Sequence, residues 1–343
     1  MSVASESKFQ VSPDIAACIA EERIPIIDVG DFLSGDADAL EQFATDLRAI
    51  QESLGFYCIV NHGIDQGLID RSFDQIAELF ALPDETKLKY RVDFHHQGFI
   101  PNKSLILRWS KIAKNEKKDL NEAWAFMRER TADDPKVKAN TRHRNLNQWP
   151  EELPEFRTTL LEYQETMAVL ATRMLPAYAR ALELPADYFD EKFSHPEYYN
   201  RCAWYPPVEA EEGQFSLSPH SDHSSMTYLP LMDVAGLQVM APSGKWMEIE
   251  PLRGAIVVNT GEFFNRWTNG RFIATPHRVV PPLKDRYALT FFYNCNDETV
   301  ADPIPTCINP GDKPVYVPMS FHDFFITYMD GNYIYRTAEM DGD

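Results

Sequence analysis

The chain has 343 residues, enough to bury a substantial core in one large domain or two fused ones. Hydrophobic residues make up 44% and aromatic residues 12%, which is typical of a globular enzyme and excludes an intrinsically disordered chain. With 33 basic and 52 acidic side chains the formal charge is −19, which argues against nucleic acid or an anionic membrane as the main partner.

Five cysteines are scattered along the chain, and no two of them form a Cys-x-x-Cys pair. Such a set fits reduced thiols in the cytoplasm better than a disulfide framework or a thiolate metal site. The first residues lack the basic start and apolar run of a signal peptide, and no apolar stretch is long enough to span a bilayer. We therefore expect a soluble, cytoplasmic protein that does not bind membranes.

The first half of the sequence predicts helices mixed with short strands, after a loosely held arm over residues 1–22. The predicted elements are a strand over 24–29, a helix over 43–54, a strand over 56–60 and a helix over 66–80. Pro25 favours an edge position for the first strand, because it cannot donate a hydrogen bond to a neighbour. A long amphipathic helix is predicted over 155–184, and Pro176 is expected to kink or interrupt it.

From about residue 198 the sequence changes to short β-rich segments separated by Gly, Pro and Asn. The predicted strands are 225–231, 236–241, 246–250, 254–259, 277–280 and 286–294. Many short antiparallel strands in close succession favour a sandwich or a jelly roll closed on itself. The expected class is α+β, with a helical and mixed N-terminal half that supports a C-terminal β core.

A candidate metal site lies inside this β-rich region. In an extended segment residues i and i+2 share a face, so His220 and Asp222 can bind one ion while Ser221 points away. His277, at the head of a later predicted strand, supplies a third candidate ligand. Two imidazoles and one carboxylate on one face of an octahedron leave three positions open, as in non-haem iron(II) oxygenases.

Two other interpretations fit the same three residues. A zinc hydrolase uses the same types of ligand. A purely structural role would make His277 a strand-end histidine and Asp222 a turn residue. His223, next to the ligand pair, is predicted to face the opposite side and to be structural.

The segment from Arg286 to Phe292 alternates, so that Arg286, Ala288, Thr290 and Phe292 share one face. If this face lines the inside of the β core, the Arg286 guanidinium is buried without an acidic neighbour on its own face. A buried guanidinium is costly unless a carboxylate pairs with it, so we predict that it binds a dicarboxylic co-substrate. A surface arginine at a strand start is the alternative.

The sequence resembles the isopenicillin N synthase-like branch of the iron(II)/2-oxoglutarate-dependent dioxygenases over roughly residues 23–330. The segments that carry the resemblance are Ile24–Asp28, Gly55–Tyr57, Val60–Ile64, His220–His223, Gly236–Val239, Gly244–Trp246, Asn259–Glu262, Arg266–Asn269 and Thr275–Val279. They occur in the family's order, which makes the resemblance highly specific.

The resemblance implies a distorted double-stranded β-helix, a jelly-roll or cupin-like core, with Fe(2+) bound by His220, Asp222 and His277. It also implies 2-oxoglutarate and O2 as co-substrates, with Arg286 and Tyr205 binding the distal carboxylate of 2-oxoglutarate. The expected reaction is oxidation of a C–H bond of a small molecule, by hydroxylation, desaturation or ring closure, in specialised metabolism.

Two positions depart from the family pattern. The family usually carries Arg-x-Ser, whereas Ala288 stands at the third position here, and Thr290 on the same face is predicted to compensate for the lost hydroxyl. Ala203 replaces an asparagine that often precedes the tyrosine in plant relatives. The missing serine keeps open a 2-oxoglutarate-independent iron oxidase of the same fold, with isopenicillin N synthase-type cyclisation. A non-catalytic binding protein is disfavoured by the intact ligand set.

The substrate pocket is expected to be lined by Phe99, Phe264, Phe292 and Asn294. Residues 103–118 carry six basic side chains against one acidic, unusual in so acidic a chain. This run is either a solvated helical face or an entrance loop that attracts an anionic substrate, in which case Lys103 and Arg108 contact the substrate.

On this basis we divide the chain into four regions. They are the N-terminal arm (1–22), a mixed helical region (23–197), the iron and 2-oxoglutarate β core (198–300) and a C-terminal helical segment (301–343). The aromatic-rich stretch Phe321–Tyr335 folds over the cavity as a lid or packs as a plain helix. We expect a monomer or a small homo-oligomer.

Overall fold

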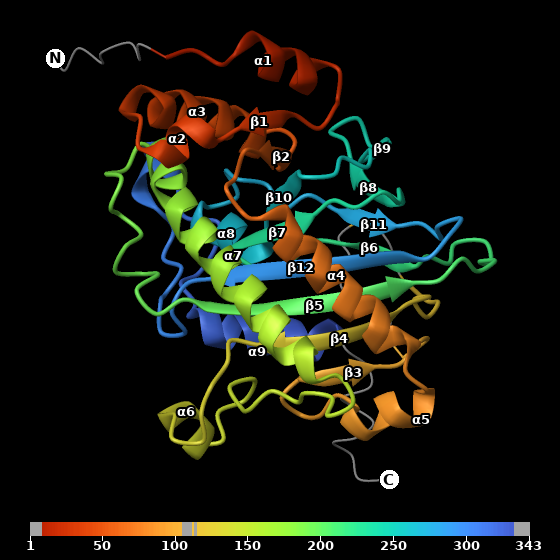
Figure 1. Ribbon diagram of the computed structural model, residues 1–343. Coiled ribbons are helices and arrows are strands. Elements are labelled where there is room, and N and C mark those ends of the chain that lie inside the picture. The colour runs from red at the N-terminus through yellow and green to blue at the C-terminus, as the bar shows by residue number, and fades with distance from the viewer. Residues whose placement is uncertain (1–8, 105–111, 113–114, 333–343) are drawn as a thin grey trace, which may run out of the picture.

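The protein is built around an extended, mainly antiparallel sheet with its three longest helices packed against one face (Figure 1). The computed structural model describes residues 9–104, 112 and 115–332. The strands of this part are β1 (Ile26–Asp28), β2 (Phe56–Val60), β3 (Gly98–Ile100), β4 (Glu122–Met127), β5 (Glu197–Tyr205), β6 (Leu217–His220), β7 (Met226–Pro230), β8 (Leu237–Met240), β9 (Trp246–Glu248), β10 (Ile256–Thr260), β11 (His277–Val279) and β12 (Arg286–Asn294).

The helices of the described residues cover both long and very short segments. The α-helices are α1 (Pro13–Ala20), α2 (Gly30–Ser34), α3 (Ala37–Gln51), α4 (Gln66–Ala81), α5 (Asp84–Lys87), α6 (Pro135–Lys138), α7 (Pro154–Ala181), α8 (Glu262–Trp267) and α9 (Phe321–Asn332). Two short 3-10 helices are η1 (Leu88–Tyr90) and η2 (Pro305–Cys307). Within the described part of the chain, no helix combines the length and apolar character needed to cross a bilayer.

The strands form two sheets. The larger has eight strands in the order β1-β2-β10-β7-β12-β5-β4-β3, and the smaller has four in the order β6-β11-β8-β9. All pairings are antiparallel except that of β1 with β2. The larger sheet takes strands from the mixed N-terminal region as well as from the β core, so the two predicted regions share one sheet.

Most predicted strands and helices are confirmed, but the loosely held arm over 1–22 is wrong for its described part, because α1 packs Ile15 into the core. Each of the six strands predicted after residue 198 has an observed counterpart from β7 to β12, and β1 lies at a sheet edge, as Pro25 predicts. The predicted interruption of the long helix is wrong, because α7 continues through Pro176 to Ala181. Its last turns remain helical because Ala177, Tyr178 and Ala179 are fully buried, and this packing offsets the hydrogen bond that proline cannot donate.

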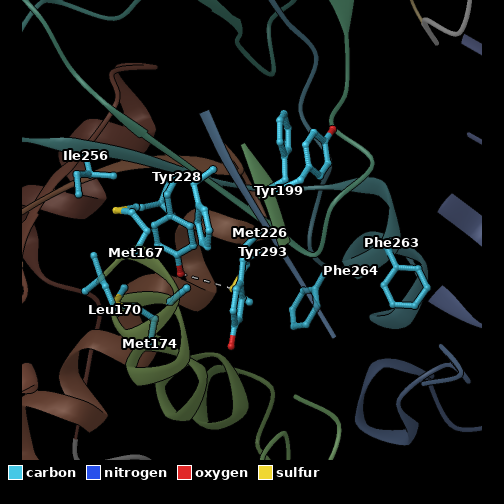
Figure 2. Packing of buried hydrophobic residues seen from close by; sticks show 14 of the residues in the cluster. Met167, Leu170, Met174, Tyr199, Met226, Tyr228, Ile256, Phe263, Phe264 and Tyr293 are labelled. Atoms are coloured by element: carbon cyan, nitrogen blue, oxygen red, sulfur yellow. Dashed lines mark hydrogen bonds between the residues drawn. The ribbon is translucent and has the colours of Figure 1, made fainter. Parts of the chain in front are cut away.

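The hydrophobic core lies between helices α3, α4 and α7 and the larger sheet. Figure 2 shows Met167 and Met174 of α7 close to Tyr228 of β7 and Tyr293 of β12 in this core. The core therefore fixes β7, β10 and β12 from the helical side, which leaves their other face for the smaller sheet.

A buried ionic network ties the segment after β4 to the ends of β5 and β12. Arg144 donates two hydrogen bonds to Asp297, of 2.6 and 2.9 Å, and Lys136 lies 2.6 Å from the same carboxylate. Arg130 donates to Glu197 at 2.6 Å. Burial alone would raise the pKa of Asp297, but the Arg144 and Lys136 cations hold it well below its usual range. Each buried charge in the network has a partner, so removal of one side chain would leave another buried charge poorly compensated.

We expect Asp297→Ala to lower the free energy of unfolding by about 3–5 kcal/mol, because Arg144 and Lys136 lose their closest counter-ion and must share Glu197 with Arg130. Glu298→Ala is the matched control and should change stability by less than about 1 kcal/mol, since Glu298 is exposed. Urea denaturation followed by circular dichroism measures both values.

The difference in stability between the wild type and Asp297→Ala is predicted to depend on pH. The folded-state pKa of Asp297 is depressed, so its carboxylate stabilises the fold at pH values above the unfolded pKa of about 4. This contribution is lost as the pH falls below that value. The wild-type advantage over Asp297→Ala should therefore shrink in acid, and an advantage that grows as the pH falls would contradict the assignment.

Candidate active site

A cavity lies between the two sheets, and both sheets supply its walls. Its apolar lining includes Phe56, Leu217, Leu229, Val257 and Val279. The polar side chains that line it are Tyr199, Arg201, Tyr205, His220, Asp222, His223, Thr227, Asn259, His277, Arg286, Thr290 and Tyr328. A largely apolar pocket with convergent polar groups is the usual form of a small-molecule site.

Three of these side chains converge on one point. His220 ends β6 and His277 begins β11, and the antiparallel register places them directly opposite each other. The ring centroids are 4.3 Å apart. Asp222 follows β6, and its Oδ1 lies 3.8 Å from His220 Nε2 and 3.6 Å from His277 Nε2. Neighbouring ligands of one octahedral ion lie roughly 3 Å apart, so small side-chain shifts let all three share an ion.

Both imidazoles present a free ring nitrogen to this point. His220 Nδ1 is 2.8 Å from the carbonyl oxygen of Ser218, and His277 Nδ1 is 3.2 Å from that of Thr275. Because a carbonyl only accepts hydrogen bonds, each Nδ1 donates its proton there, which leaves Nε2 as the ring nitrogen available to a metal ion. Burial and the neighbouring His277 lower the pKa of His220 to about 3, so this ring is neutral at physiological pH.

The carboxylate is held in its charged form. Burial alone would raise the pKa of Asp222, but the two imidazoles and hydrogen bonds from Asn259 and Thr227 lower it below its usual value. Asn259 Nδ2 donates to Asp222 Oδ2 at 2.7 Å, which leaves Oδ1 directed at the imidazoles. Two imidazoles and one carboxylate are a donor set for a divalent first-row metal ion.

Backbone contacts fix the loop that carries Asp222. The Glu262 amide donates to the Asp222 carbonyl at 2.7 Å. The preceding residue, Gly261, passes so close to the backbone of Ser224 that only glycine fits. A Cβ at this position would lie 2.1 Å from the Ser224 carbonyl oxygen. On the other side, Asp119 accepts hydrogen bonds from the amide and hydroxyl of Ser218, whose carbonyl orients His220.

A buried guanidinium lies in the same cavity. Arg286 is 5% exposed and pairs in register with Tyr205, above whose ring its guanidinium lies at 5.1 Å. Burial lowers the pKa of Arg286, and Tyr205 partly offsets this. Its Nη1 has no hydrogen-bond partner among the described residues. A buried cation with an unsatisfied donor fits the carboxylate of a small ligand.

The structure brings together most of the predicted site residues and separates some others. His220, Asp222, His277, Arg286 and Tyr205 line one cavity, as do Thr290 and Phe292. Thr290 lies opposite Arg201, four residues along β12 from Arg286. That the Thr290 hydroxyl compensates for the missing serine hydroxyl stays a prediction.

Phe99, Phe264 and Asn294 do not line this cavity, so their assignment to the pocket is not supported by the structure. Phe264 is fully buried in the hydrophobic core, since α8 turns this side chain toward the other aromatic residues (Figure 2). Phe99 is 2% exposed in the same core. Asn294 accepts a hydrogen bond from the Ser225 amide at 2.9 Å, which gives it a structural role.

The basic run is only partly described. Lys103 lines a surface depression with Lys117 and Glu211, apart from the cavity, and Lys117 pairs with Glu211 at 2.8 Å. Arg108 lies outside the described residues. Residues 105–111 and 113–114 of the run also lie outside the described residues, so the helical face and the entrance loop both stay predictions.

His223 lines the cavity, so the prediction that it faces the opposite side is wrong, although it is not part of the converging group. The strand ends at His220, and the alternation of faces does not continue beyond it. His223 Nε2 lies 3.1 Å from the Tyr199 hydroxyl, and burial lowers its pKa to about 4. It therefore acts as a neutral part of the wall.

Residues that the sequence interpretation missed include Tyr199, Arg201, Asn259 and Tyr328. Tyr199 and Arg201 share the cavity face of β5 with Tyr205, so the period of two could have found them once that strand was known. Tyr328 reaches the cavity from α9 and donates to the Ser221 carbonyl at 2.9 Å. No local signal marks Asn259 as the partner of Asp222.

Comparisons with known proteins agree with this geometry. Residues 24–152 match the family described as the N-terminal region of non-haem dioxygenases in morphine synthesis, and residues 196–294 match the 2OG-Fe(II) oxygenase superfamily. The 2-oxoglutarate-Fe(II) type oxidoreductase hxnY of Emericella nidulans is 31% identical over 307 residues, 87% of each chain. The 2-oxoglutarate-dependent dioxygenase citB of Monascus ruber is 32% identical over 80% of this chain and 85% of its own.

A solved structure shows the same fold. A full-length Neurospora crassa protein in complex with alpha-KG superposes with a TM-score of 0.78 at 26% identity, covering 90% of this chain and 96% of its own. The two sheets with a cavity between them are thus the double-stranded β-helix that the sequence predicted.

We expect Asn259→Ala to weaken the affinity for a divalent metal ion about 10- to 100-fold, because Asp222 loses the hydrogen bond that orients its carboxylate. Titration of the metal-free protein with Mn(II), followed by electron paramagnetic resonance, measures this affinity. Asn309→Ala, on a distant exposed loop, is the control and should retain it. Equal affinities in both variants would contradict a supporting role for Asn259.

Proposed function

The chain belongs to the 2-oxoglutarate- and iron(II)-dependent oxygenases, and we propose that His220, Asp222 and His277 are its iron ligands. The observation that carries this assignment is the convergence of their ligand atoms, all within 4.8 Å of one another, in a buried cavity. The enzyme is a dioxygenase that uses 2-oxoglutarate and acts on a small molecule.

Arg286 and Tyr205 are proposed to bind the distal carboxylate of 2-oxoglutarate. The supporting observation is the buried Arg286 guanidinium, whose Nη1 has no partner among the described residues. A carboxylate would supply both the missing charge and the missing acceptor. Thr290 remains a weaker candidate for this role, because it lies about 13 Å along the strand from Arg286.

The bound iron, together with 2-oxoglutarate and O2, supplies the oxidation of a substrate C–H bond, with release of succinate and carbon dioxide. The protein contributes orientation and the exclusion of water. Asn259 and the Ser218 carbonyl hold the ligands Asp222 and His220 in place, which limits the reorganisation needed when substrate binds. Apolar side chains such as Leu229 and Val257 keep the cavity dry around the reacting groups.

We further propose that the enzyme works in specialised metabolism in the cytoplasm, as a monomer or small homo-oligomer, on an anionic substrate. The five cysteines are all unpaired in the structure, which supports a reducing compartment. We also propose the limits 198–300 for the β core and 301–343 for the C-terminal segment. We propose that α9 is a lid of the cavity, because Tyr328 of α9 donates a hydrogen bond to Ser221, which lies between two of the proposed ligands.

The proposed function is tested by succinate release from 2-oxoglutarate in the presence of Fe(II) and a panel of small acids and phenolics. We expect release that increases with an accepted substrate, and no release from Asp222→Ala, which removes the carboxylate ligand. Substrate oxidation without succinate would instead indicate the 2-oxoglutarate-independent oxidase. A fully active Asp222→Ala enzyme would refute the ligand assignment.

Two variants test the co-substrate site in opposite directions. Arg286→Gln should raise the KM for 2-oxoglutarate about 10- to 150-fold, because a charge-assisted hydrogen bond contributes about 1.5–3 kcal/mol. Ala288→Ser should lower that KM, by up to about 10-fold, because it supplies a hydroxyl on the same cavity face. Succinate-release kinetics at varied 2-oxoglutarate measure both.

Mn(II) affinity should be unchanged in these two variants. Arg266→Gln on α8 is the arginine control, since Arg266 donates to the Val317 carbonyl outside the cavity. An unchanged KM in Arg286→Gln would contradict the co-substrate assignment.

A further inference from the structure

The two proposed histidine ligands lie in the same short sequence pattern and are oriented in the same way. Residues 218–220 read Ser-Pro-His and residues 275–277 read Thr-Pro-His. In both, the ring Nδ1 bonds to the carbonyl oxygen of the first residue of the pattern, at 2.8 Å for His220 and 3.2 Å for His277. The direction of each Nε2 therefore depends on how firmly that first residue is held.

The strands that carry the two histidines receive different support. β11, which begins at His277, lies between β6 and β8, whereas β6, which ends at His220, is at an edge of the smaller sheet. The register between β6 and β11 also shifts between its two paired positions. An edge strand with an irregular ladder is poorly fixed by backbone pairing alone. His220 therefore needs support from outside the sheet.

The segment 115–121 supplies contacts of this kind to residues 216–219. Asn115 Nδ2 donates to the Pro219 carbonyl at 3.1 Å, and Asn121 Nδ2 donates to the Ser216 carbonyl at 2.5 Å. Between these two contacts, the Oδ1 atom of Asp119 accepts hydrogen bonds from the amide and the hydroxyl of the intervening serine, at 2.9 and 2.5 Å. The segment thus holds the start of β6 by side chains, where no neighbouring strand of the described chain does.

Asp119 is the member of this segment that reaches Ser218, whose carbonyl orients His220. It is 1% exposed, and within the described part of the chain the hydrogen bonds of its side chain all go to Ser218. Because the amide and the hydroxyl leave Ser218 in different directions, two bonds to one oxygen fix both its position and its rotation. Asp119 does not line the cavity, so it acts on the metal site through Ser218 and not by contact.

Asp119 also interacts electrostatically with the Arg201 cation. The Nη2 atom of Arg201, however, donates to the Asn121 amide oxygen at 2.6 Å. The variant Asp119→Asn separates the two interactions. An amide oxygen still accepts both hydrogen bonds from Ser218, whereas the negative charge is removed.

We propose that Asp119 is a positioning residue for the metal ligand His220, which it aligns by fixing Ser218 with two hydrogen bonds. This inference rests on the proposed function, because it takes His220 as a ligand of the iron. The Ser218 carbonyl, held in this way, keeps the Nδ1 proton and directs Nε2 toward the side of Asp222. A residue outside the cavity and remote in the sequence thereby sets the geometry of the metal site.

The chain contains a matched control for this carboxylate. Asp46 accepts hydrogen bonds from the amide and the hydroxyl of Ser12, each at 2.7 Å, and Ser12 also precedes a proline. Asp46 is 5% exposed and lies on α3, away from the cavity. Replacing either aspartate removes an equivalent pair of hydrogen bonds, but the Asp46 pair holds no proposed ligand.

The test is the affinity of the metal-free full chain for Mn(II), measured by electron paramagnetic resonance, with the visible spectrum of the Co(II) complex. We expect Asp119→Ala to weaken Mn(II) binding about 10-fold or more and to change the Co(II) spectrum, because the His220 ring loses its fixed direction. Asp119→Asn should stay closer to the wild type in both measurements. Ser218→Ala, which removes one of the two bonds, should weaken binding by less than Asp119→Ala, and Asp46→Ala should bind like the wild type.

Thermal unfolding of the metal-free variants, followed by circular dichroism, distinguishes positioning from stability. A merely structural role for Asp119 predicts lower unfolding temperatures in Asp119→Ala and Asp46→Ala alike, with wild-type Mn(II) affinity and Co(II) spectrum in both. That result would overturn the proposal. An Asp119→Asn variant as weak as Asp119→Ala would also overturn it, because the effect would then belong to the charge. Where Asp119→Ala does not fold, wild-type affinity in Ser218→Ala has the same consequence.

The variant His220→Ala separates this inference from the proposed function. It removes the ligand itself and should bind Mn(II) more weakly than Asp119→Ala. Wild-type affinity in His220→Ala would contradict the ligand assignment, and the proposed function with it. Wild-type affinity in Asp119→Ala beside a weakened His220→Ala would contradict the positioning role alone.

Discussion

The active site depends on one cross-strand contact, the pairing of β6 with β11. This register places His220 opposite His277, although the two are far apart in the sequence. Successive residues of a strand point to opposite faces, so a slip by one residue would turn one imidazole out of the cavity. The pairing of β11 with β8 on its other side, and the Asp119 contact to Ser218, hold this register.

The opposite wall depends on a second register, that of β5 with β12. It places Arg286 beside Tyr205 and Arg201 beside Thr290 on one face. The helices behind this sheet fill its other face with apolar side chains, so polar groups on the two strands gather on the cavity side. The buried Arg286 guanidinium, whose Nη1 has no partner among the described residues, is costly without an anion, so its end of the wall fits a carboxylate.

The buried charges of the molecule fall into two classes with different consequences. Around Asp297 and Glu197 each charge has a partner of opposite charge within the chain. In the cavity, Arg286 has no carboxylate partner among the described residues, and its Nη1 has no hydrogen-bond acceptor there. Such incomplete pairing lowers the stability of the isolated protein and is retained where a ligand completes it.

The sequence by itself determined the elements whose cause is local. The alternation of apolar residues predicted the strands of the β core, and the i, i+2 spacing of His220 and Asp222 with the later His277 predicted the converging group. It misplaced Phe264 and Asn294 and gave His223 the wrong side, because helix orientation and the end of β6 follow from packing against distant segments. Only the tertiary structure decided that Asn259 supports Asp222 and that Arg201 faces the cavity, since both depend on strand pairings between residues remote in sequence.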